Sequence, residues 1–594
     1  MSWKSFQRAA RLNDSIFRGY SKRMSFFSFL SFQGGRDTPA QNPELYIEKP
    51  DGTEKRATEE DLFGYSRHRW IFNEEKELAR RYRKFDLQKL IEVAIDTAGD
   101  GAHSCTKVLK CVEGLHNKAL LLTMDNGKEV FAKLPNPNAG PARYVTASEV
   151  ATREFLREVV NVPVPRVFAW SCDPAANPVG AEYIVEEKAP GTRLGSLWHD
   201  WPRKSKLRVI DQVSKIEHAL TTTRFTKHGS LYFKQDLPTL KERNDTLLVE
   251  PLPSVQSADL DRYVIGPLTS AELWSSGRED IDLDRGPWQR PEDYARAIGN
   301  NEVAWIEKHA SPRINYYVSL KESELPDQAL ALLSKYLKVT PYLVPSDNDS
   351  EAVANVLWHP DLHLDNIFVD PTTCQITGII DWQSARIAPL FYQSCIPRMF
   401  RHDGPVREGW VVPERPDNFD SLSEEEQIRM DRTLESERMH KFYEAMVYKH
   451  APNHWEVLQR HRDVQLKRNP TWLVTGVWEN RDLFFLRQSL ITIVALWDTL
   501  PHSNSTTKCP INFTRAELDL HVKEDENMTG IGNMLKLFRD RGVLPVDGMV
   551  DPEDYEAAKA NSVKFKEIFV GLAKDEEERE LFNKLWPYQD QESE

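Results

Sequence analysis

The pattern of apolar positions predicts a small β-rich region early in the chain. Two apolar runs, 119–124 and 128–133, flank Asp125-Asn126-Gly127, and Asn-Gly between apolar runs favours a tight β-hairpin. Another run, 181–185, predicts a further strand. We therefore expect a sheet built around this hairpin.

Helical periodicity appears on either side of the hairpin. The first helix is predicted after Asp86, a suitable N-cap, and its apolar face is formed by Leu87, Leu90, Ile91 and Ala94. The second is predicted to start at the capping-box spacing Thr146 to Glu149 and to run through Val159. The Gly- and Pro-rich stretch 34–50 predicts a linker.

From about residue 191 the pattern becomes predominantly helical. Three short apolar runs interrupt it, and they predict strand–loop–strand around a polar segment: 353–358, 367–369 and 376–380. Amphipathic stretches predict helices at 483–500 and 563–572. The second half should therefore be a large helical region holding one small group of strands.

The composition argues against some classes of function. The net charge of −14 argues against nucleic-acid binding, which needs a basic face. No uninterrupted apolar run reaches the roughly 18 residues of a transmembrane helix. The six cysteines are scattered without CxxC pairs, which is typical of thiols in a reducing compartment.

The first 36 residues depart from this acidic character. They hold seven Lys or Arg residues against the single acid Asp14, with serines and apolar residues interleaved. This composition is typical of a mitochondrial transit peptide. The alternative is a basic tail on a cytoplasmic protein.

The most informative segment lies between the short strands. It reads His359-Pro360-Asp361-Leu362-His363-Leu364-Asp365-Asn366, and Ile380-Asp381-Trp382 follows. The kinase catalytic-loop template H-R-D-L-x-x-x-N fits it at every fixed position except Arg. We expect Asp361 to be the catalytic residue that orients an acceptor hydroxyl, with Asn366 and Asp381 holding Mg²⁺ on nucleotide phosphates.

Upstream residues complete an ATP site in this interpretation. Lys133 ends the second hairpin strand, where a kinase carries its phosphate-binding lysine, and Glu149 is placed to pair with it. Gly114 to Asn117 precede the hairpin where a phosphate-covering loop would lie. Lys133, Glu149, Gly114 and Asn117 are therefore the candidate ATP-binding residues.

These features predict an α+β fold of the two-lobed, protein-kinase-like kind. The chain would divide into a targeting or disordered segment, a small β-rich N-lobe, and a large mostly helical C-lobe: 1–45, 46–190 and 191–594. Within the C-lobe we expect a catalytic loop, an insertion and a C-terminal helical extension: 357–382, about 248–346, and from about 421.

Two alternatives remain open. His359, Asp361, His363 and Asp365 alternate, so on a strand they would share one face and could bind a hydrolytic metal. The other alternative is a pseudokinase that serves as an interaction platform.

On these residues the chain resembles the aminoglycoside phosphotransferase, or choline-kinase-like, superfamily. His359, Asp361, His363 and Asn366 match its H-G-D-x-H-x-x-N loop, with Pro360 in place of the glycine, and Asp381-Trp382 matches its later I-D-W. The segments 62–75, 121–156, 281–288 and 357–370 are similar to a fungal subgroup that includes altered inheritance of mitochondria protein 9.

The resemblance implies a phosphotransferase that uses ATP and Mg²⁺, with a small-molecule hydroxyl acceptor and a mitochondrial location. One position departs from the subgroup, because Leu115 stands where its nucleotide loop tends to carry a second glycine. That departure is what favours the pseudokinase alternative. The acidic stretch 279–284 could attract a cationic acceptor or could be a solvated surface loop.

Overall fold

The computed structural model describes residues 42–237, 246–250, 257–346, 348–500, 508–542 and 544–590. The basic segment that suggests a transit peptide lies outside the described residues. Residues 44–48 contradict the predicted linker, because they form a strand that pairs in parallel with a strand of the main sheet. The backbone groups of this segment are therefore hydrogen-bonded within the sheet.

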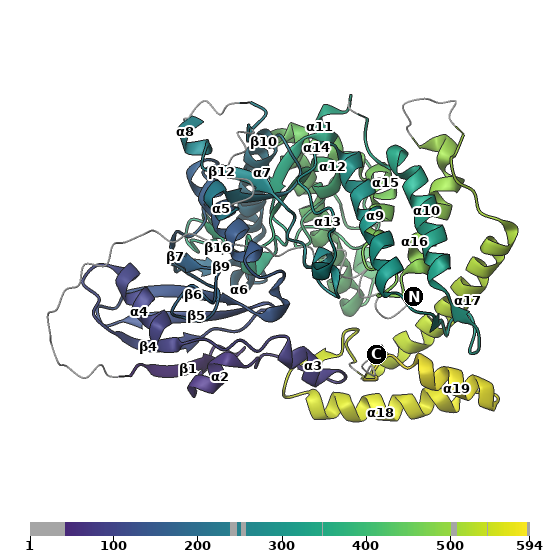
Figure 1. The fold of residues 1–594 in the computed structure, drawn as a ribbon, viewed down its shortest axis with the longest axis horizontal. Coiled ribbons are helices and arrows are strands. Elements are labelled where there is room, and N and C mark those ends of the chain that lie inside the picture. The colour runs from purple at the N-terminus through teal and green to yellow at the C-terminus, as the bar shows by residue number, and fades with distance from the viewer. Residues whose placement is uncertain are drawn as a thin grey trace.

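A seven-stranded sheet forms the smaller lobe (Figure 1). Its strand order is β2-β1-β4-β5-β6-β8-β7, with the bounds Glu54–Arg56, Glu44–Glu48, Cys105–Lys110, Asn117–Met124, Glu129–Pro135, Tyr183–Glu187 and Val167–Ser171. β5 and β6 form the predicted hairpin, in which Met124 N donates to Lys128 O at 2.8 Å. Gly127 adopts a φ of 81° in this turn, a conformation that explains the glycine there.

Two helices pack against this sheet. In α4 (Leu87–Ala98), Asp86 accepts the N–H of Lys89 as the predicted N-cap, and the expected apolar face is buried. The second helix, α5 (Tyr144–Glu158), faces the larger lobe, where Phe155 packs against Phe225 and Tyr263. α5 therefore lies in the core of the larger lobe, which also includes Ile184 of β8.

The predicted capping box at Thr146 is wrong. α5 begins two residues earlier, at Tyr144, and its N-cap residue Arg143 makes no side-chain cap hydrogen bond. Thr146 Oγ1 donates instead to Glu182 Oε2 at 3.1 Å, next to strand β8. The Thr146 hydroxyl thus contacts a distant carboxylate from within the first turn of α5 and does not cap the helix.

The buried Glu182 carboxyl should make stability depend on pH. Burial raises its pKa to about 7, against the opposing effect of the Thr146 hydrogen bond. Because an unfolded Glu titrates near ~4.3, its contribution is complete below that pH and is lost as the pH rises through about 7. Glu182→Gln should therefore raise the free energy of unfolding at pH 8 by up to about 3 kcal/mol.

Denaturant unfolding of both proteins at pH 4.5 and pH 8 checks this expectation. The gain should shrink markedly at the lower pH, where the wild-type carboxyl is already protonated. Parallel pH profiles for the two proteins would contradict the proposed titration.

The larger lobe is mainly helical. Its helices are α6 (Leu194–Trp198), α7 (Arg203–Thr222), α8 (Ser257–Leu260), α9 (Pro291–His309), α10 (Pro326–Leu343), α11 (Ser350–Val353), α12 (Leu390–Gln393), α13 (Glu424–His450), α14 (Pro452–Leu458), α15 (His461–Val474) and α16 (Leu483–Ala495). α9 and α10 come from the predicted insertion and pack side by side with α15 and α16 (Figure 1).

Short strands and turns carry the segments between these helices. The strands are β9 (Thr192–Arg193), β10 (Arg224–Phe225), β11 (Ser230–Phe233), β12 (Tyr263–Gly266), β13 (Arg313–Ile314), β14 (Ser323–Glu324), β15 (Asn355–Trp358), β16 (Ile367–Val369), β17 (Ile376–Ile379) and β18 (Arg386–Pro389). The 3₁₀ turns are η1 (Pro137–Ala139), η2 (Lys234–Asp236), η4 (Ala271–Leu273), η5 (Arg278–Asp280), η6 (Leu364–Asn366), η7 (Phe419–Ser421) and η8 (Trp497–Thr499). The predicted strand–loop–strand is confirmed by β15, β16 and β17.

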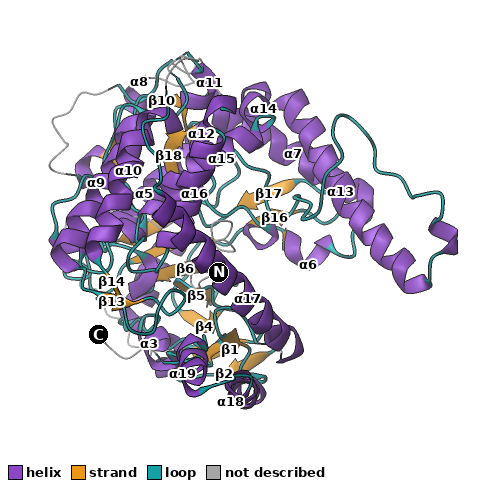
Figure 2. Ribbon diagram, turned by 90° about the vertical axis from the view of Figure 1, so that its right-hand side faces the viewer, coloured by secondary structure: helices purple, strands orange, loops and turns teal. Residues whose placement is uncertain are grey.

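The last part of the chain returns to the smaller lobe (Figures 1 and 2). It contains α17 (Arg515–Gly542), β19 (Met549–Val550), α18 (Tyr555–Gly571) and α19 (Glu576–Leu585). β19 pairs with β3 (Arg69–Trp70), which lies between α2 (Glu59–Phe63) and α3 (Glu74–Ala79). The two ends of the described chain therefore pack together. Among the described residues, no helix is both long and apolar enough to span a membrane.

Candidate functional site

Lys133 lies at the centre of the candidate site. β6 places it opposite Ala119 of β5, with its Nζ 2.9 and 3.0 Å from the Glu149 carboxylate oxygens and 2.8 Å from Asp381 Oδ1. Burial alone would lower the pKa of Lys133, but attraction by Asp381 and Glu149 outweighs it and the pKa is raised. The ammonium thus stays charged and joins the two lobes.

A second buried ion pair, between Arg153 and Glu186, lies next to Glu149. Arg153, one helical turn further along α5, lies 3.8 Å from Glu149 Oε1 and also pairs with Glu186 of β8. Burial raises the pKa of Glu186, although Arg153 opposes the shift. No local pattern in the sequence indicates this pair, because Glu186 lies on a separate strand.

The polar loop after β15 is organised by His359. Its Nδ1 accepts the N–H of Asp361 at 3.1 Å, so Nε2 must carry the proton that it shares with Ile380 O at 2.9 Å. Burial lowers the pKa of His359 to about 4, and the ring packs edge-on against Trp382 with centroids 4.5 Å apart. His359 is therefore a neutral support for the loop.

This geometry argues against the alternative of a His/Asp metal cluster. Both ring nitrogens of His359 are engaged by the backbone, and Nδ1 of His363 accepts the N–H of Asp365 at 3.3 Å. The segment is also not a continuous strand, since η6 follows His363. The four side chains consequently do not form the common strand face that this alternative requires.

The Asp361 carboxyl group is 48% exposed. Burial nevertheless raises its pKa, with a contribution from Asp381, while His363 acts in the opposite direction. His363 Nε2 lies 3.7 Å from Asp361 Oδ2. The loop thus presents a carboxylate that an incoming molecule can reach.

Asn366 and Asp381 are held close together by the backbone. Ile380 N donates to Asn366 O at 2.9 Å, while Asn366 Nδ2 donates to Asp361 O at 2.9 Å. Asp381 has a φ of 59°, a left-handed conformation that is uncommon for non-glycine residues but that aspartate adopts more readily than most. Because Asn366 donates through its nitrogen, its amide oxygen and the Asp381 carboxylate offer the oxygen donors that Mg²⁺ prefers.

The predicted nucleotide loop joins β4 to β5. Asn117 begins β5, and its Nδ2 donates at 2.8 Å to Oε1 of Gln383, two residues beyond Asp381. The loop at Gly114 has room, since a Cβ there would have no atom within 4 Å. The structure thus brings Lys133, Glu149 and Asp381 into direct contact and links Asn117 to the same loop. Gln383 was not identified from the sequence.

The last residue of the acidic stretch 279–284, Asp284, has a structural role in the insertion. The Asp284 carboxylate accepts the N–H of Gly286 and the Nε1–H of Trp288, each at 3.0 Å. These bonds favour the surface-loop interpretation at this position.

Comparisons with known proteins place the chain in a family. Residues 286–393, which contain Asp361, Asn366 and Asp381, match the model of the phosphotransferase enzyme family. The chain is 32% identical over 524 residues to a Subtelomeric hrmA-associated cluster protein of Aspergillus fumigatus, covering 82% of this chain and 97% of the relative. It is 23% identical over 554 residues to Altered inheritance of mitochondria protein 9, mitochondrial, of Yarrowia lipolytica, covering 88% and 91%.

The chain therefore belongs to the phosphotransferase enzyme family. Its relatives include the fungal proteins just named, which confirms the resemblance seen in the sequence. The expected kinase-like, two-lobed fold is confirmed as well. Superposition on an ethanolamine kinase of Plasmodium vivax gives a TM-score of 0.31 at 11% identity, over 66% of this chain and 82% of that one.

Proposed function

We propose that the protein is an ATP- and Mg²⁺-dependent phosphotransferase acting on a hydroxyl group of a small molecule. The observation that carries this proposal is the contact of Lys133 with both Glu149 and Asp381. One lysine thereby connects the sheet, the helix α5 and the loop after β17. This arrangement suits a cation that positions phosphates between two lobes.

Each residue has a distinct part in the proposed reaction. Asp361 accepts a hydrogen bond from the acceptor hydroxyl and aligns its oxygen with the terminal phosphate, while Lys133, fixed by Glu149, holds the phosphates. As the new O–P bond forms, the bond to ADP breaks and Asp361 takes the hydroxyl proton. Asn366 and Asp381 would hold Mg²⁺, which when bound neutralises charge on the phosphate oxygens. No covalent intermediate on the protein is required.

A pseudokinase is the second candidate function. Asp381 Oδ1 lies 2.8 Å from Lys133 Nζ, so the lysine neutralises the carboxylate that would otherwise attract a cation. The single glycine at 113–117 also favours this candidate.

We also propose a mitochondrial location. The relative of Yarrowia lipolytica carries "mitochondrial" in its name, and the first 36 residues here are basic and almost free of acids. Residues 1–41 fused to a fluorescent protein should direct it to mitochondria, and a diffuse cytoplasmic signal would contradict this location.

Thermal unfolding with Mg-ATP tests the nucleotide site. Ligand at 100 times its dissociation constant should stabilise the protein by about 2.7 kcal/mol, and omission of Mg²⁺ should reduce the shift. A flat response would contradict ATP binding. Turnover on a metabolite extract, followed through ADP formation, then separates the enzyme from a pseudokinase that only binds nucleotide.

A further inference from the structure

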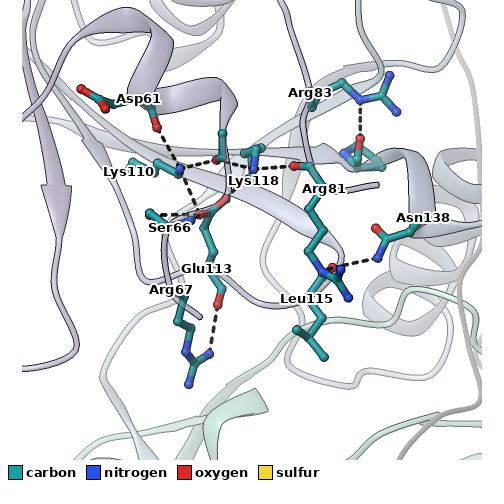
Figure 3. A network of polar contacts seen from close by, with 12 residues as sticks. Asp61, Ser66, Arg67, Arg81, Arg83, Lys110, Glu113, Leu115, Lys118 and Asn138 are labelled. Carbon is teal, nitrogen blue, oxygen red and sulfur yellow. Dashed lines mark hydrogen bonds and ion pairs between the residues drawn. The ribbon is translucent and has the colours of Figure 1, made fainter. Parts of the chain in front are cut away.

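The loop between β4 and β5 is anchored by a buried carboxylate. Glu113 is 1% exposed and pairs with Lys118 at 2.6 Å and Lys110 at 3.0 Å. Its Oε2 also accepts the N–H of Ser66 at 3.0 Å. Figure 3 shows these side chains converging on Glu113 from β4, β5 and the segment between α2 and β3. The loop is thus fixed at its base by charge that the solvent does not screen.

Two arginines from the segment 58–83 hold the backbone carbonyls of the same loop. Arg67 Nη1 donates to Glu113 O at 3.0 Å, and Arg81 Nε donates to Leu115 O at 3.2 Å (Figure 3). Asn138 Nδ2 adds a second donor to Leu115 O at 3.1 Å. Alternate carbonyls of the loop are therefore fixed from outside.

Fixing these carbonyls also fixes the direction of the next N–H groups. In a trans peptide the C=O of one residue and the N–H of the next point to opposite sides. The N–H groups of Gly114 and His116 therefore point away from Arg67 and Arg81. Within the described part of the chain, neither N–H donates to a protein acceptor. Two main-chain N–H groups of one loop that lack a protein acceptor are available to bind an anion.

We propose that Arg81, assisted by Arg67, is a positioning residue for nucleotide binding, because it fixes the loop so that the N–H groups of Gly114 and His116 bind the phosphates. The inference rests on the proposed function. It also explains how a loop with one glycine can bind phosphates. The two arginines hold the backbone in a geometry that other loops reach through the flexibility of additional glycines.

Arg81 is itself held by its surroundings. Its Nη1 donates to Glu77 O at 2.7 Å and Glu77 Oε2 at 2.6 Å, and its guanidinium lies 4.4 Å from the ring centroid of Trp70. Trp70 in turn pairs with Met549 in the β3–β19 ladder. The C-terminal extension therefore supports the arginine that positions the loop.

The test compares Arg81→Lys with Arg83→Lys. A lysine at 81 keeps the charge next to Glu77 but has no Nε–H to reach Leu115 O. The matched control loses a similar bond, from Arg83 Nε to Pro135 O at 2.8 Å, outside the loop. Arg67→Gln, on an exposed residue, is a second variant that should not endanger folding.

Two measurements follow on the full-length protein. Without nucleotide, hydrogen exchange at the hydrogen-bonded amides of Cys111 and Val112 should accelerate in Arg81→Lys and Arg67→Gln, but not in Arg83→Lys. Calorimetry should give about tenfold weaker Mg-ATP binding for Arg81→Lys, with adenosine affinity unchanged, since only the phosphates contact the loop.

The outcomes separate the inference from the proposed function. If wild type binds Mg-ATP and Arg81→Lys binds it equally well, or loses ATP and adenosine affinity by the same factor, the positioning role is wrong and the proposed function stands. If the wild-type protein binds neither Mg-ATP nor adenosine, the proposed function fails, and the positioning role fails with it.

Discussion

Replacing Asp361 with asparagine is expected to abolish phosphoryl transfer while leaving Mg-ATP affinity nearly unchanged. Asparagine keeps the size of the side chain but cannot take the acceptor proton, and a positioned acid–base group contributes roughly 10²- to 10⁴-fold to a rate. The main-chain bonds that hold the loop, from Asp361 N to His359 and from Asn366 to Asp361 O, do not involve the carboxylate. Turnover measurements check the loss of phosphoryl transfer, and calorimetry on the same preparation checks that Mg-ATP affinity is unchanged.

Asp365→Asn is the matched control, because Asp365 is an exposed acid of the same loop. It should retain most of the activity. The raised pKa of Asp361 adds a pH test: wild-type kcat should fall as the pH is lowered through a value above the ordinary range of an aspartate, because the protonated carboxyl cannot accept the proton. Turnover that survives in the Asp361 variant would overturn the assignment.

Replacing Asp381 with asparagine should remove the magnesium dependence of ATP binding. The variant keeps an oxygen near Asn366 but loses the negative charge that attracts the cation, and loss of a supporting metal contact typically costs about 10- to 100-fold in affinity. Wild type should bind ATP much more tightly with Mg²⁺ than with EDTA. In the variant the two affinities should nearly coincide.

Asp370→Asn serves as the control for general effects of lost charge. The Asp370 carboxylate accepts the N–H groups of Thr372 and Thr373 in a turn beyond β16, and its loss should leave the magnesium dependence intact. If Mg²⁺ still tightened ATP binding in the Asp381 variant as much as in wild type, the metal role would belong to another residue.

The site was predictable where its signals are local. Asp361, Asn366 and Asp381 lie within one segment of 21 residues, and Lys133 lies in the second strand of a hairpin that Asn126-Gly127 predicts. Glu149 was predicted as the partner of Lys133, and the structure places their charged groups in contact. The capping box failed at Thr146 because the helix already begins at Tyr144. Thr146 therefore lies inside α5, where its hydroxyl donates to Glu182, 36 residues away in sequence.

The support of the nucleotide loop was beyond sequence reasoning for a physical reason. β3 and β19 are two residues each, too short for any alternation of apolar and polar positions to show. Arg67 and Arg81 reach the loop only through its backbone carbonyls, which are identical at every residue and leave no pattern. A solvated arginine and one that fixes a loop look alike in a sequence.

The pairing of the two ends of the chain also sets an order of events during synthesis. Tyr555 covers the guanidinium of Arg69 at 3.3 Å, and its hydroxyl donates to Glu74 Oε2, 481 residues earlier in sequence. At about 5–20 residues per second, Arg69 and Trp70 would wait tens of seconds on the ribosome before their partners exist. The catalytic loop is translated well within that interval. A nascent or truncated chain that ends after α16 would therefore carry every proposed catalytic and metal-binding residue without the final support of its nucleotide loop.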